Sequence, residues 1–599
     1  MSRSRLLALA IAVVTFAAFA PALRAGFVEW DDHYNFLNNP YYRGLGRAQL
    51  GWMLTSAWSG HWAPLTWLTL AADFRLWGMA PFGYHLTSLL LHAAAAAVFF
   101  FVAARLLARA QPQAATGSIQ AGAAVAALVF AVHPLRVESV VWISERRDVL
   151  SGLFYLLTVL AYLRAADAAA GARRRWLALS IAAYALAMTS KAIVMSLPAV
   201  LLVLDAYPLR RLTGHWRERA IEKVPYVVIA GAGAVAAAKL VAEIKTLAEY
   251  PLWVRPAVFG HTLVFYLEKT VLPQGLSPLY ELPARWTLSD GRLLFGLILP
   301  IVLTVVLLAV RRRWPAPLAV WIAYVITLMP VGGLAIQAGP QLTADRYTYL
   351  ACMGIALLAG GACALALGSA VLAPRLRRVV AATVVVALLG LGVLSWQQTA
   401  IWHDSVALWT HATGVDPTCA KCQNRMGASL HAAGRSAAGI APMQRAVMLR
   451  PDVGDYRADL GLVLVWLGRP AEAVPQLERA VEAFPDNVDL QSRLGAALTQ
   501  SGHPEQARRR LETALRRRPD HVGALTEMGF ALVAADDVAA AVPYFERAIT
   551  RAPRAAAPRY GLTRAVVALG DRARAERELA ALRAIDPRAA DLAERAARR

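Results

Sequence analysis

Charged residues are scarce in this chain. Aspartate, glutamate, lysine and arginine make up 17% of its 599 residues, whereas 58% are hydrophobic, and the mean hydropathy is +0.44. Length alone suggests about four domains. The apolar residues instead gather into runs of about 17–25, the length that crosses a bilayer core as a helix. We therefore expect residues 1–397 to form a polytopic membrane domain.

Cysteine is also rare, with four residues in the chain. Cys352 and Cys363 lie in an apolar segment, where we expect them in the core. Cys419 and Cys422 form a lone Cys-x-x-Cys, which is weak for zinc without a second pair. They form a local disulfide if they lie in an oxidising compartment, and stay free thiols otherwise. No ligand spacing demands a metal, although a divalent ion is compatible with the acidic residues described below; we expect no cofactor.

The formal net charge of +22 is large enough to suggest nucleic-acid binding. Many of the arginines, however, fall in short clusters between apolar runs, where they set membrane topology. The remainder decorate the C-terminal helices. We therefore expect no nucleic-acid partner.

Membrane topology follows from the apolar runs and the basic clusters between them. The candidate spans are 6–24, 84–108, 120–134, 149–164, 176–190, 192–207, 224–242, 292–310, 315–334, 347–369 and 378–396. All basic clusters fall on one side if the run 257–272 lies along the surface or re-enters, and the positive-inside rule makes that side cytoplasmic. This predicts eleven spans in the cytoplasmic membrane, with the N-terminus inside and the C-terminus outside. The start of the chain also fits a signal peptide, but its apolar run is long for one and favours an anchor.

The first outside loop, residues 25–83, begins with Glu29-Trp30-Asp31-Asp32-His33-Tyr34-Asn35. This stretch holds three carboxylates and an imidazole at the membrane surface. Its many tryptophans favour amphipathic helices at the interface. The acidic residues either belong to a solvated loop or take part in chemistry. Further charged clusters on the same side of the membrane favour the second interpretation.

One such cluster follows Pro134, which ends the preceding helix. Glu138, Glu145 and Asp148 lie one or two helical turns apart. Charges so near a bilayer are costly unless they pair or face a water-filled cavity. A structural salt-bridge cluster is one interpretation, and an anion site is the other, because arginine binds phosphate through bidentate contacts and lysine acts as a point charge. The cations on this face are Arg146, Arg147, Lys191 and Arg346.

After residue 397 the sequence becomes periodic. Prolines recur every 34 residues, at 417, 451, 485, 519, 553 and 587, and glycine recurs in the same frame at 427, 461, 495 and 529. A 34-residue period with small residues where two helices cross is the tetratricopeptide (TPR) signature. The sequence thus predicts an all-α protein. A linker at 398–419 joins the membrane bundle to a TPR solenoid of about five repeats at 420–599, whose concave groove suits peptides or proteins.

The order of these motifs resembles the transmembrane and TPR-containing O-mannosyltransferases and their bacterial relatives, within the GT-C class of glycosyltransferases. The matching stretches are Trp30-Asp31-Asp32, His61-Trp62-Ala63-Pro64-Leu65-Thr66, Gly83-Tyr84-His85-Leu86 with Leu91-His92, His133-Pro134 to Asp148, Ser190-Lys191 with Leu197-Pro198, and Asp345-Arg346-Tyr347-Thr348-Tyr349-Leu350. Glu145-Arg146-Arg147-Asp148 stands where animal members typically have a Gly-Arg-Ala-Asp-like stretch, which leaves the identity of the donor sugar open.

The resemblance implies an inverting transferase that moves a sugar from a polyprenyl phosphate to a hydroxyl, with Ser or Thr of exported proteins as acceptor and the TPR groove recruiting them. Asp31 or Asp32 would take the hydroxyl proton. Cations would stabilise the leaving phosphate. The candidates for the phosphate are Arg146, Arg147, Lys191 and Arg346, and those for orienting the sugar or acceptor are Glu138, Asp148, His61 and His85.

Two other functions are compatible with the sequence. The same chemistry can act on a lipid or glycan acceptor, with the repeats recruiting partners. A non-enzymatic membrane scaffold or a transporter is the third hypothesis, although a transporter would more naturally carry its acidic residues within the spans. In each case membrane lipids surround the N-terminal part of the chain.

Overall fold

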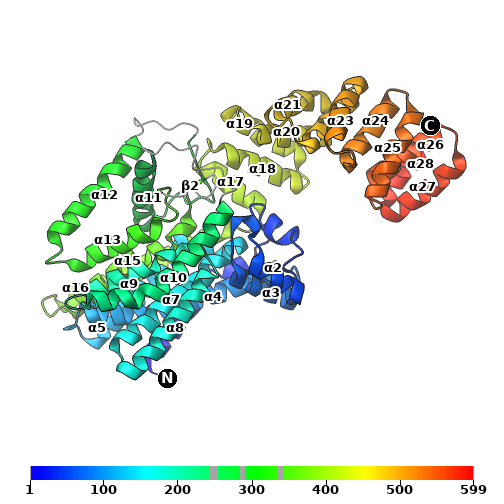
Figure 1. Cartoon of the computed structure of the whole chain (residues 1–599). Helices are drawn as coiled ribbons and strands as arrows, with labels where there is room; N and C mark the ends of the chain where they lie inside the picture. Colours follow the sequence, from blue (N-terminus) through cyan, green and yellow to red (C-terminus); the bar gives the residue numbers. More distant parts are fainter. Residues whose placement is uncertain (1, 242–253, 284–290, 335–340, 598–599) are drawn as a thin grey trace. The chain divides into compact units, whose positions relative to one another are not determined.

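The computed structural model describes residues 2–241, 254–283, 291–334 and 341–597. It divides into two compact units, Met1–Asp416 and Pro417–Arg599. Helices dominate both (Figure 1). In the described residues the strands are β1 (Tyr280–Glu281) and β2 (Gln341–Thr343), which pair antiparallel. The predicted all-α fold is confirmed.

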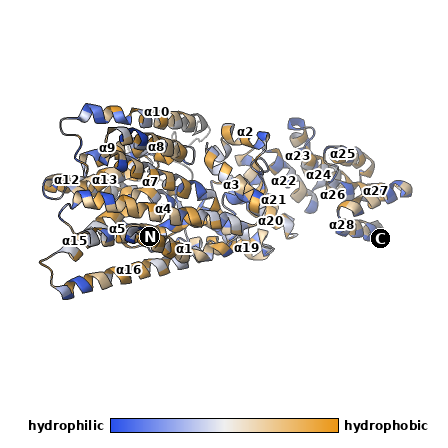
Figure 2. Cartoon of the chain, turned by 90° about the horizontal axis from the view of Figure 1, so that it is seen from below, coloured by the Kyte–Doolittle hydropathy of each residue, from blue (hydrophilic) through white to orange (hydrophobic). Residues whose placement is uncertain are grey.

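In the first unit a helix lies at each of the eleven predicted spans. These helices are α1 (Arg3–Ala18), α4 (Pro81–Ala110), α5 (Thr116–Ala131), α7 (Arg146–Asp167), α8 (Ala170–Met188), α9 (Leu197–Ala206), α10 (Trp216–Val241), α12 (Gly291–Val310), α13 (Pro315–Leu328), α15 (Met353–Gly368) and α16 (Pro374–Ala400). Four described helices are long and apolar enough to cross a membrane, or up to six if each of two bent pairs is one span. Figure 2 shows the hydrophobic colouring of α4 and α16. The apolar helices thus identify the first unit as a membrane domain. The number of membrane spans, predicted to be eleven, stays a prediction.

The two bent pairs bring polar residues to helix ends. The chain bends by 56° between α5 and Pro134–Val141, and by 54° between Asp345–Ala351 and α15. The first break carries η4 (Pro134–Arg136), α6 (Val137–Val141) and η5 (Ile143–Glu145); the second carries η8 (Asp345–Tyr347) and α14 (Thr348–Ala351). Proline has no N–H and cannot continue the preceding helix, which accounts for the first bend.

Small residues set the closest helix contacts of this unit. A Cβ on Gly122 of α5 would lie 2.4 Å from the Gly360 carbonyl oxygen of α15, so these two backbones touch, as is common between membrane helices. The helix α11 (Val254–Val271) meets α12 in the same way, at Gly260 and Gly296. α11 covers the run expected not to cross. Whether it crosses stays a prediction.

The segment expected as a linker contains the end of α16 and a further helix, α17 (Ser405–Val415), within the first unit. Asp404 caps α17 by accepting a hydrogen bond from the Ala407 N–H at 2.8 Å. Ser405 Oγ accepts from the Glu29 N–H at 2.7 Å, and Trp409 donates to the Glu29 carbonyl at 3.3 Å. α17 therefore holds the start of the first outside loop.

The first outside loop contains short helices, as expected from its aromatic residues. They are η2 (His33–Leu37), α2 (Arg47–Thr55), η3 (Trp58–Gly60) and α3 (Pro64–Trp77), and η1 (Ala20–Arg24) directly precedes the loop. An aromatic cluster binds them together, with Phe36, Tyr42 and Trp67 buried in it. A last short helix, η6 (Ala192–Ser196), follows Lys191 in a later loop.

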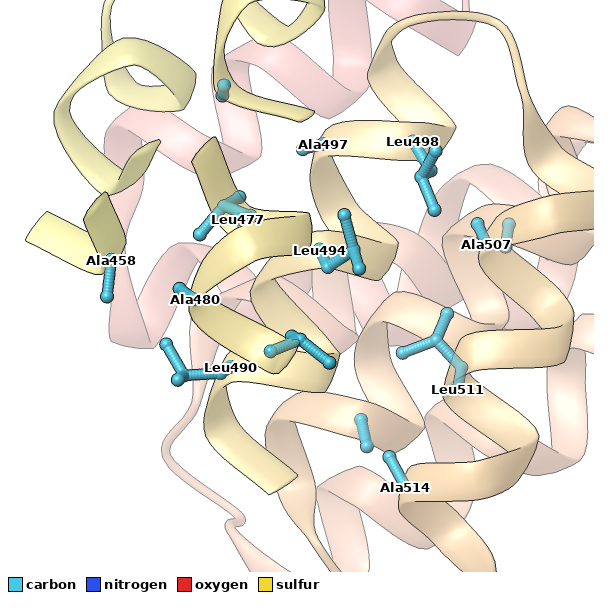
Figure 3. Close-up of a cluster of buried hydrophobic side chains, with 14 of the residues drawn as sticks. Ala458, Leu477, Ala480, Leu490, Leu494, Ala497, Leu498, Ala507, Leu511 and Ala514 are labelled. Atoms are coloured by element: carbon cyan, nitrogen blue, oxygen red, sulfur yellow. The ribbon is translucent and has the colours of Figure 1, made fainter. Parts of the chain in front are cut away.

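The second unit is a stack of helix pairs. Its helices are α18 (Ala420–Ala432), α19 (Ser436–Leu449), α20 (Gly454–Trp466), α21 (Pro470–Ala483), α22 (Val488–Gln500), α23 (Pro504–Arg517), α24 (Val522–Ala534), α25 (Val538–Arg551), α26 (Ala556–Ala568), α27 (Arg572–Ile585) and α28 (Pro587–Ala597). Leu477, Leu494 and Leu511 fill the core between successive pairs (Figure 3). Glycine lets the helices of a pair approach, since a Cβ on Gly495 would lie 2.6 Å from Leu511 Cγ.

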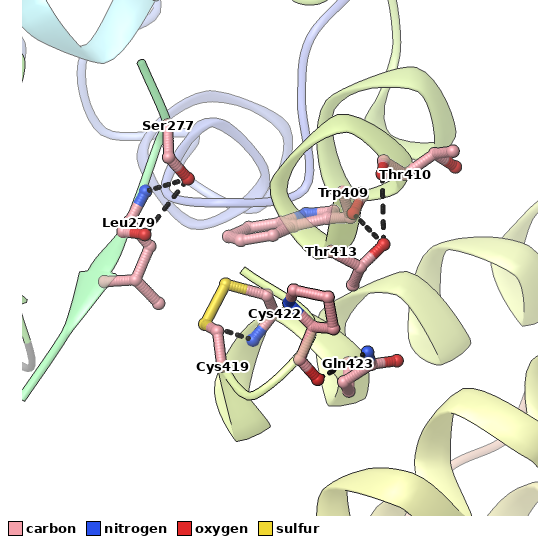
Figure 4. The surroundings of a disulfide bond; sticks show 9 residues. Ser277, Leu279, Trp409, Thr410, Thr413, Cys419, Cys422 and Gln423 are labelled. Atoms are coloured by element: carbon pink, nitrogen blue, oxygen red, sulfur yellow. Dashed lines mark hydrogen bonds between the residues drawn. A yellow bond between two sulfur atoms is a disulfide. The ribbon is translucent and has the colours of Figure 1, made fainter. Parts of the chain in front are cut away.

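The cysteines divide as the sequence allowed. Cys419 and Cys422 form a disulfide at the start of α18, where Cys419 Sγ also accepts the Cys422 N–H at 3.1 Å (Figure 4). Of the two alternatives for this pair, the structure has the disulfide. Cys352 and Cys363 are free and buried, as expected for core residues.

Candidate active site

Asp32 is buried, and its carboxylate fastens the first outside loop to the segment before α7. Asp32 Oδ1 accepts from Ser144 Oγ at 2.7 Å and from the Ser144 N–H at 3.2 Å, while Oδ2 accepts from the Val28 N–H at 3.1 Å. Only 1% of Asp32 is exposed. Burial raises the pKa of Asp32 to about 7, against the lowering effect of these hydrogen bonds. The neighbouring Asp31 is half-buried.

A line of hydrogen bonds leads from Asp32 toward the surface. The Asn35 amide donates to Ser144 Oγ at 3.0 Å, and Ser59 Oγ donates to Asn35 Oδ1 at 2.7 Å. Ser59 has φ of 56°, in the left-handed region that costs energy for a residue with a side chain. The line of hydrogen bonds thus ends at a residue whose backbone is held in a strained conformation.

A cluster of buried charges lies next to Asp32, centred on Glu145, whose side chain is fully buried. Glu145 Oε1 and Oε2 accept from Arg147 Nη2 at 2.7 Å and Nε at 3.1 Å, and Lys191 Nζ donates to Oε2 at 2.7 Å. Arg346 Nε lies 3.4 Å from the same carboxylate. One carboxylate therefore gathers three cations from three separate segments of the chain.

Two further carboxylates complete this charge cluster. Lys191 Nζ donates to Asp148 Oδ1 at 2.6 Å. Glu138 is ion-paired with the Arg346 guanidinium and accepts the Arg346 N–H at 2.8 Å. Three cations face three carboxylates, so the cluster is formally neutral. Breaking one partner of such buried pairs is strongly destabilising because it leaves an uncompensated charge.

Two small pockets open beside the charge cluster and share His61, Ala63 and Arg147. The first has an empty volume of about 410 Å³ and is also lined by Ser190 and Lys191. The second, of about 330 Å³, is also lined by Asn35, Trp58, Ser59, Trp67 and Ser144. The first pocket is therefore cationic, and the second combines neutral polar groups with aromatic rings.

His61 stands between the two pockets. The Arg147 guanidinium lowers the pKa of His61 well below its usual value, with further lowering from Lys191 and Arg346. The residue is exposed by its accessible surface, so we attribute the shift to these charges rather than to burial. The imidazole is neutral at pH 7 and can both donate and accept a hydrogen bond.

The structure separates two of the predicted site residues from the others. Arg146 is fully buried and ion-paired with Asp73 of α3, and it also donates to Ser88 Oγ at 3.1 Å and to the Tyr84 carbonyl. Its neighbour Arg147 points to the pockets because successive side chains on a helix point in directions about 100° apart. His85 is buried on α4 and lines neither pocket.

The remaining predicted residues take different positions around the pockets. Arg147 and Lys191 line them, whereas Arg346, Glu138 and Asp148 lie behind in the charge cluster. Sequence reasoning missed Asn35, Ser59 and Ser144, which line the second pocket. Asn35 closes the acidic stretch and Ser144 precedes Glu145, so their places in the sequence were the available signal. In the described part of the chain no group of three or more His, Cys, Asp or Glu side chains is placed to hold a metal ion.

Fold and site together define a helical membrane protein with a charged site at the helix ends, followed by a repeat solenoid. The tetratricopeptide repeat family model matches residues 467–527 and 532–597. The chain is 34% identical to protein O-mannosyl-transferase Tmtc2 of Drosophila melanogaster over 176 residues, which cover 28% of this chain and 18% of the relative. It is 30% identical to human protein O-mannosyl-transferase TMTC1 over 158 residues, 25% of this chain and 17% of the relative. The predicted resemblance to the TPR-containing O-mannosyltransferases is confirmed, and the matches span less than a fifth of each relative's length.

Solved structures of TPR proteins match part of this chain. The TPR protein YrrB is 21% identical, and the match covers 31% of this chain and 97% of YrrB, with a TM-score of 0.25. TTC0263, a TPR protein of Thermus thermophilus, is 20% identical over 30% of this chain and 97% of its own, with a TM-score of 0.27.

Proposed function

We propose that the first unit transfers a sugar, with inversion, from a polyprenyl-phosphate donor to the hydroxyl of a serine or threonine in an exported protein. The observation that carries the proposal is the gathering of Arg147 and Lys191 at one pocket by the buried Glu145, next to the acidic pair Asp31-Asp32. The names of the relatives, protein O-mannosyl-transferases, support the reaction class.

The first pocket would hold the phosphate of the donor. Lys191 uses two of its three N–H groups for Glu145 and Asp148, and the third is available to a ligand. Arg147 contacts Glu145 through Nε and Nη2, which leaves Nη1 for a phosphate oxygen. Glu145 fixes both cations before the donor arrives, so no reorganisation is needed as negative charge grows on the leaving group. Arg346 adds positive charge from behind Glu145.

Asp31 is the better placed of the two aspartates to act as base. Asp32 is buried, whereas Asp31 is half-buried at the surface of the same loop. In the reaction Asp31 takes the proton of the acceptor hydroxyl as its oxygen bonds to the anomeric carbon. The bond from that carbon to the phosphate oxygen breaks, and its electron pair stays on the phosphate.

The second pocket would hold the sugar or the acceptor hydroxyl. Asn35, Ser59 and Ser144 present amide and hydroxyl groups there, beside the rings of Trp58 and Trp67. Neutral His61, at the boundary of the pockets, can bind a hydroxyl without attracting the phosphate. Glu138 and Asp148 would act through the cations that they hold, and Arg146 and His85 have no direct part in this arrangement.

The second unit would recruit the protein acceptor, because TPR solenoids present a concave surface to peptides or proteins. We place the protein in the cytoplasmic membrane with the site and the repeats outside. That side follows from the basic clusters at the opposite ends of the helices.

Glycopeptide mass spectrometry of the exported proteome tests the proposal. A deletion strain would carry wild type, Asp31→Asn, or a truncation after Asp416. This end point keeps α17, which contacts Glu29. We expect Asp31→Asn to lower transfer of a hexose-sized mass to Ser/Thr peptides by about 10²–10⁴-fold, the usual contribution of a general base. The matched control is Glu268→Gln, an exposed carboxylate of the same unit.

The outcomes separate the candidate functions. Loss of the glycopeptides with Asp31→Asn at normal membrane levels supports the proposal, and the mass gives the sugar class. Loss with the truncation alone supports recruitment by the repeats. If all strains, including the deletion, give the same glycopeptides, protein glycosylation is not the function, and a lipid or glycan acceptor or a scaffold takes its place.

A further inference from the structure

A long apolar cavity runs between five helices of the first unit. Its volume, counted with the open space at its mouth, is about 2070 Å³, compared with about 410 and 330 Å³ for the two pockets of the proposed site counted in the same way. Phe99 (α4), Leu156 (α7), Val200 (α9), Val320 (α13) and Leu357 (α15) represent its five walls. A cavity of this size and composition is therefore a place for an apolar ligand.

One end of this cavity is cationic. Arg210, which follows α9, and Arg312 and Arg313, which precede α13, line it. All three are exposed, and no described acidic side chain forms an ion pair with them. Trp314 also lines this end, is 59% exposed, and lies under the Arg313 guanidinium at 5.7 Å. Arginine beside an interfacial tryptophan is typical of the headgroup level of a membrane. We call these three arginines the arginine rim.

The arginine rim lies at the opposite helix ends from the proposed active site. Lys191 precedes α9 and Arg210 follows it, and Asp148 stands in the first turn of α7 whereas the cavity begins at Tyr155. The ten residues of α9 alone separate the two levels by about 15 Å. A phosphate bound at the rim is therefore a different phosphate from the one proposed to bind Lys191.

We propose that this cavity binds an anionic phospholipid, with its acyl chains between α4, α7, α9, α13 and α15 and its phosphate at the arginine rim. Apolar walls exclude a hydrophilic ligand, and the three cations of the rim select a negative headgroup over a zwitterionic one. The lipid comes from the leaflet that faces the basic clusters. This lipid site is separate from the proposed transfer reaction. Lipid binding here does not require that reaction and does not provide its donor.

The position of the cavity also predicts what the lipid does. Leu350 and Ala351 line its far end and lie four and five residues after Arg346 of the charge cluster. Tyr155, on the opposite wall, lies two turns after Asp148 on α7. A ligand that fills the space between these helices stabilises the folded unit by mass action, because it binds the folded state alone.

The test uses the full chain, purified in detergent and stripped of lipid. Phosphatidylglycerol, phosphatidylcholine and a polyprenyl phosphate are added separately, and binding is measured by native mass spectrometry together with thermal unfolding. We expect phosphatidylglycerol to bind and to raise the unfolding temperature more than phosphatidylcholine does. Replacing the three arginines together (Arg210→Gln, Arg312→Gln, Arg313→Gln) should weaken phosphatidylglycerol binding roughly 10- to 100-fold.

A matched triple variant controls for the loss of charge. Arg375→Gln, Arg377→Gln and Arg378→Gln removes as many positive charges from the start of α16, away from the cavity lining, and should leave binding unchanged. Ala323→Phe, which projects into the cavity, should displace the lipid while keeping the rim.

Three results would overturn the proposal. The first is equal binding of both phospholipids, and the second is the same loss in both triple variants. The third is rim-dependent binding of polyprenyl phosphate but not of phosphatidylglycerol, which would assign the cavity to a prenyl carrier. None of these outcomes bears on Asp31, so failure here and failure of the proposed transfer reaction are distinguishable.

Discussion

The two units use charged residues in opposite ways. In the charge cluster of the first, the ion pairs are buried and join distant parts of the chain: Lys191 and Glu145 are 46 residues apart, and Arg346 and Glu138 are 208 apart. In the second, pairs such as Arg469–Glu472 lie three residues apart on the surface of one repeat, with 44% and 52% of the two side chains exposed. Water screens the exposed pairs, whereas the buried ones depend on every partner.

This difference fits the place proposed for the chemistry. A buried, mutually paired cluster holds cations in fixed positions, which suits the binding of a developing anion. An exposed pair is mobile and contributes little to stability or geometry. The second unit is instead stabilised by its periodic apolar core. Substitutions in the two units should therefore differ sharply in effect.

The largest effect should come from Glu145→Gln. This change leaves Arg147 and Lys191 without their shared carboxylate, and removing one partner of a buried pair costs about 3–5 kcal/mol. We expect a marked fall in the unfolding temperature of the purified protein, measured by tryptophan fluorescence, together with loss of transfer. Glu482→Gln, in an exposed pair with Arg479, is the control. Equal unfolding temperatures for the two variants would contradict the contrast between the units.

A steric change in the solenoid should come next. In Gly495→Val the new side chain meets Leu511, since even a Cβ would lie 2.6 Å from Leu511 Cγ. Overpacking a core of this kind costs about 1–3 kcal/mol. Faster hydrogen exchange in α22 and α23, with unchanged exchange in α7, would match this expectation. The control is Gly414→Ala, because a Cβ at Gly414 would meet open space. Gly502→Ala is unsuitable, since Gly502 has φ of 85° and any side chain there would strain the backbone.

A half-buried acid in the solenoid, Glu527, gives a smaller, pH-dependent effect. Burial raises the pKa of Glu527 on α24 from 4.5 to about 7. Between these values the folded chain binds a proton that the unfolded chain does not, so the second unit loses stability as pH rises from about 4.5 to 7. Glu527→Gln should stabilise it at pH 8 by on the order of 1–3 kcal/mol, and by nothing near pH 4.

Thermal unfolding at several pH values, with hydrogen exchange in α24 as the local readout, checks this expectation. Glu576→Gln, an exposed carboxylate of the same unit, should give no such trend. A stabilisation by Glu527→Gln that is the same at pH 4 and pH 8 would show that the charge of Glu527 is not its cause.

The smallest effect should be that of Arg469→Ala. Its pair with Glu472 is exposed, and such exposed pairs contribute little to stability. Its unfolding temperature should stay close to that of wild type, and the small difference should disappear in high salt because the pair is screened. A loss as large as that of Glu145→Gln would remove the distinction between the two units.

Some of the site followed from the sequence and some did not. The sequence pointed to Arg147, Lys191 and Arg346 as neighbours, and the structure brings them together at Glu145; their common side of the membrane stays a prediction. The sequence could not show that Arg146 and Arg147 have different roles. The two residues are adjacent, and they differ only in the direction in which their side chains leave α7. The structure pairs Arg146 with Asp73, a residue that no local pattern connects to it.

The sequence by itself determined the helices and the repeats. Both depend on local periodicity: apolar runs of membrane length, and a 34-residue spacing of proline and glycine. The tertiary structure alone decided that Asp32 is buried while Asp31 is not, that Glu145 gathers three cations, and that five helices enclose a cavity with an arginine rim. These features arise where segments far apart in the sequence pack against one another, as Arg346 and Glu138 do across 208 residues. No local stretch of sequence specifies which distant segments meet.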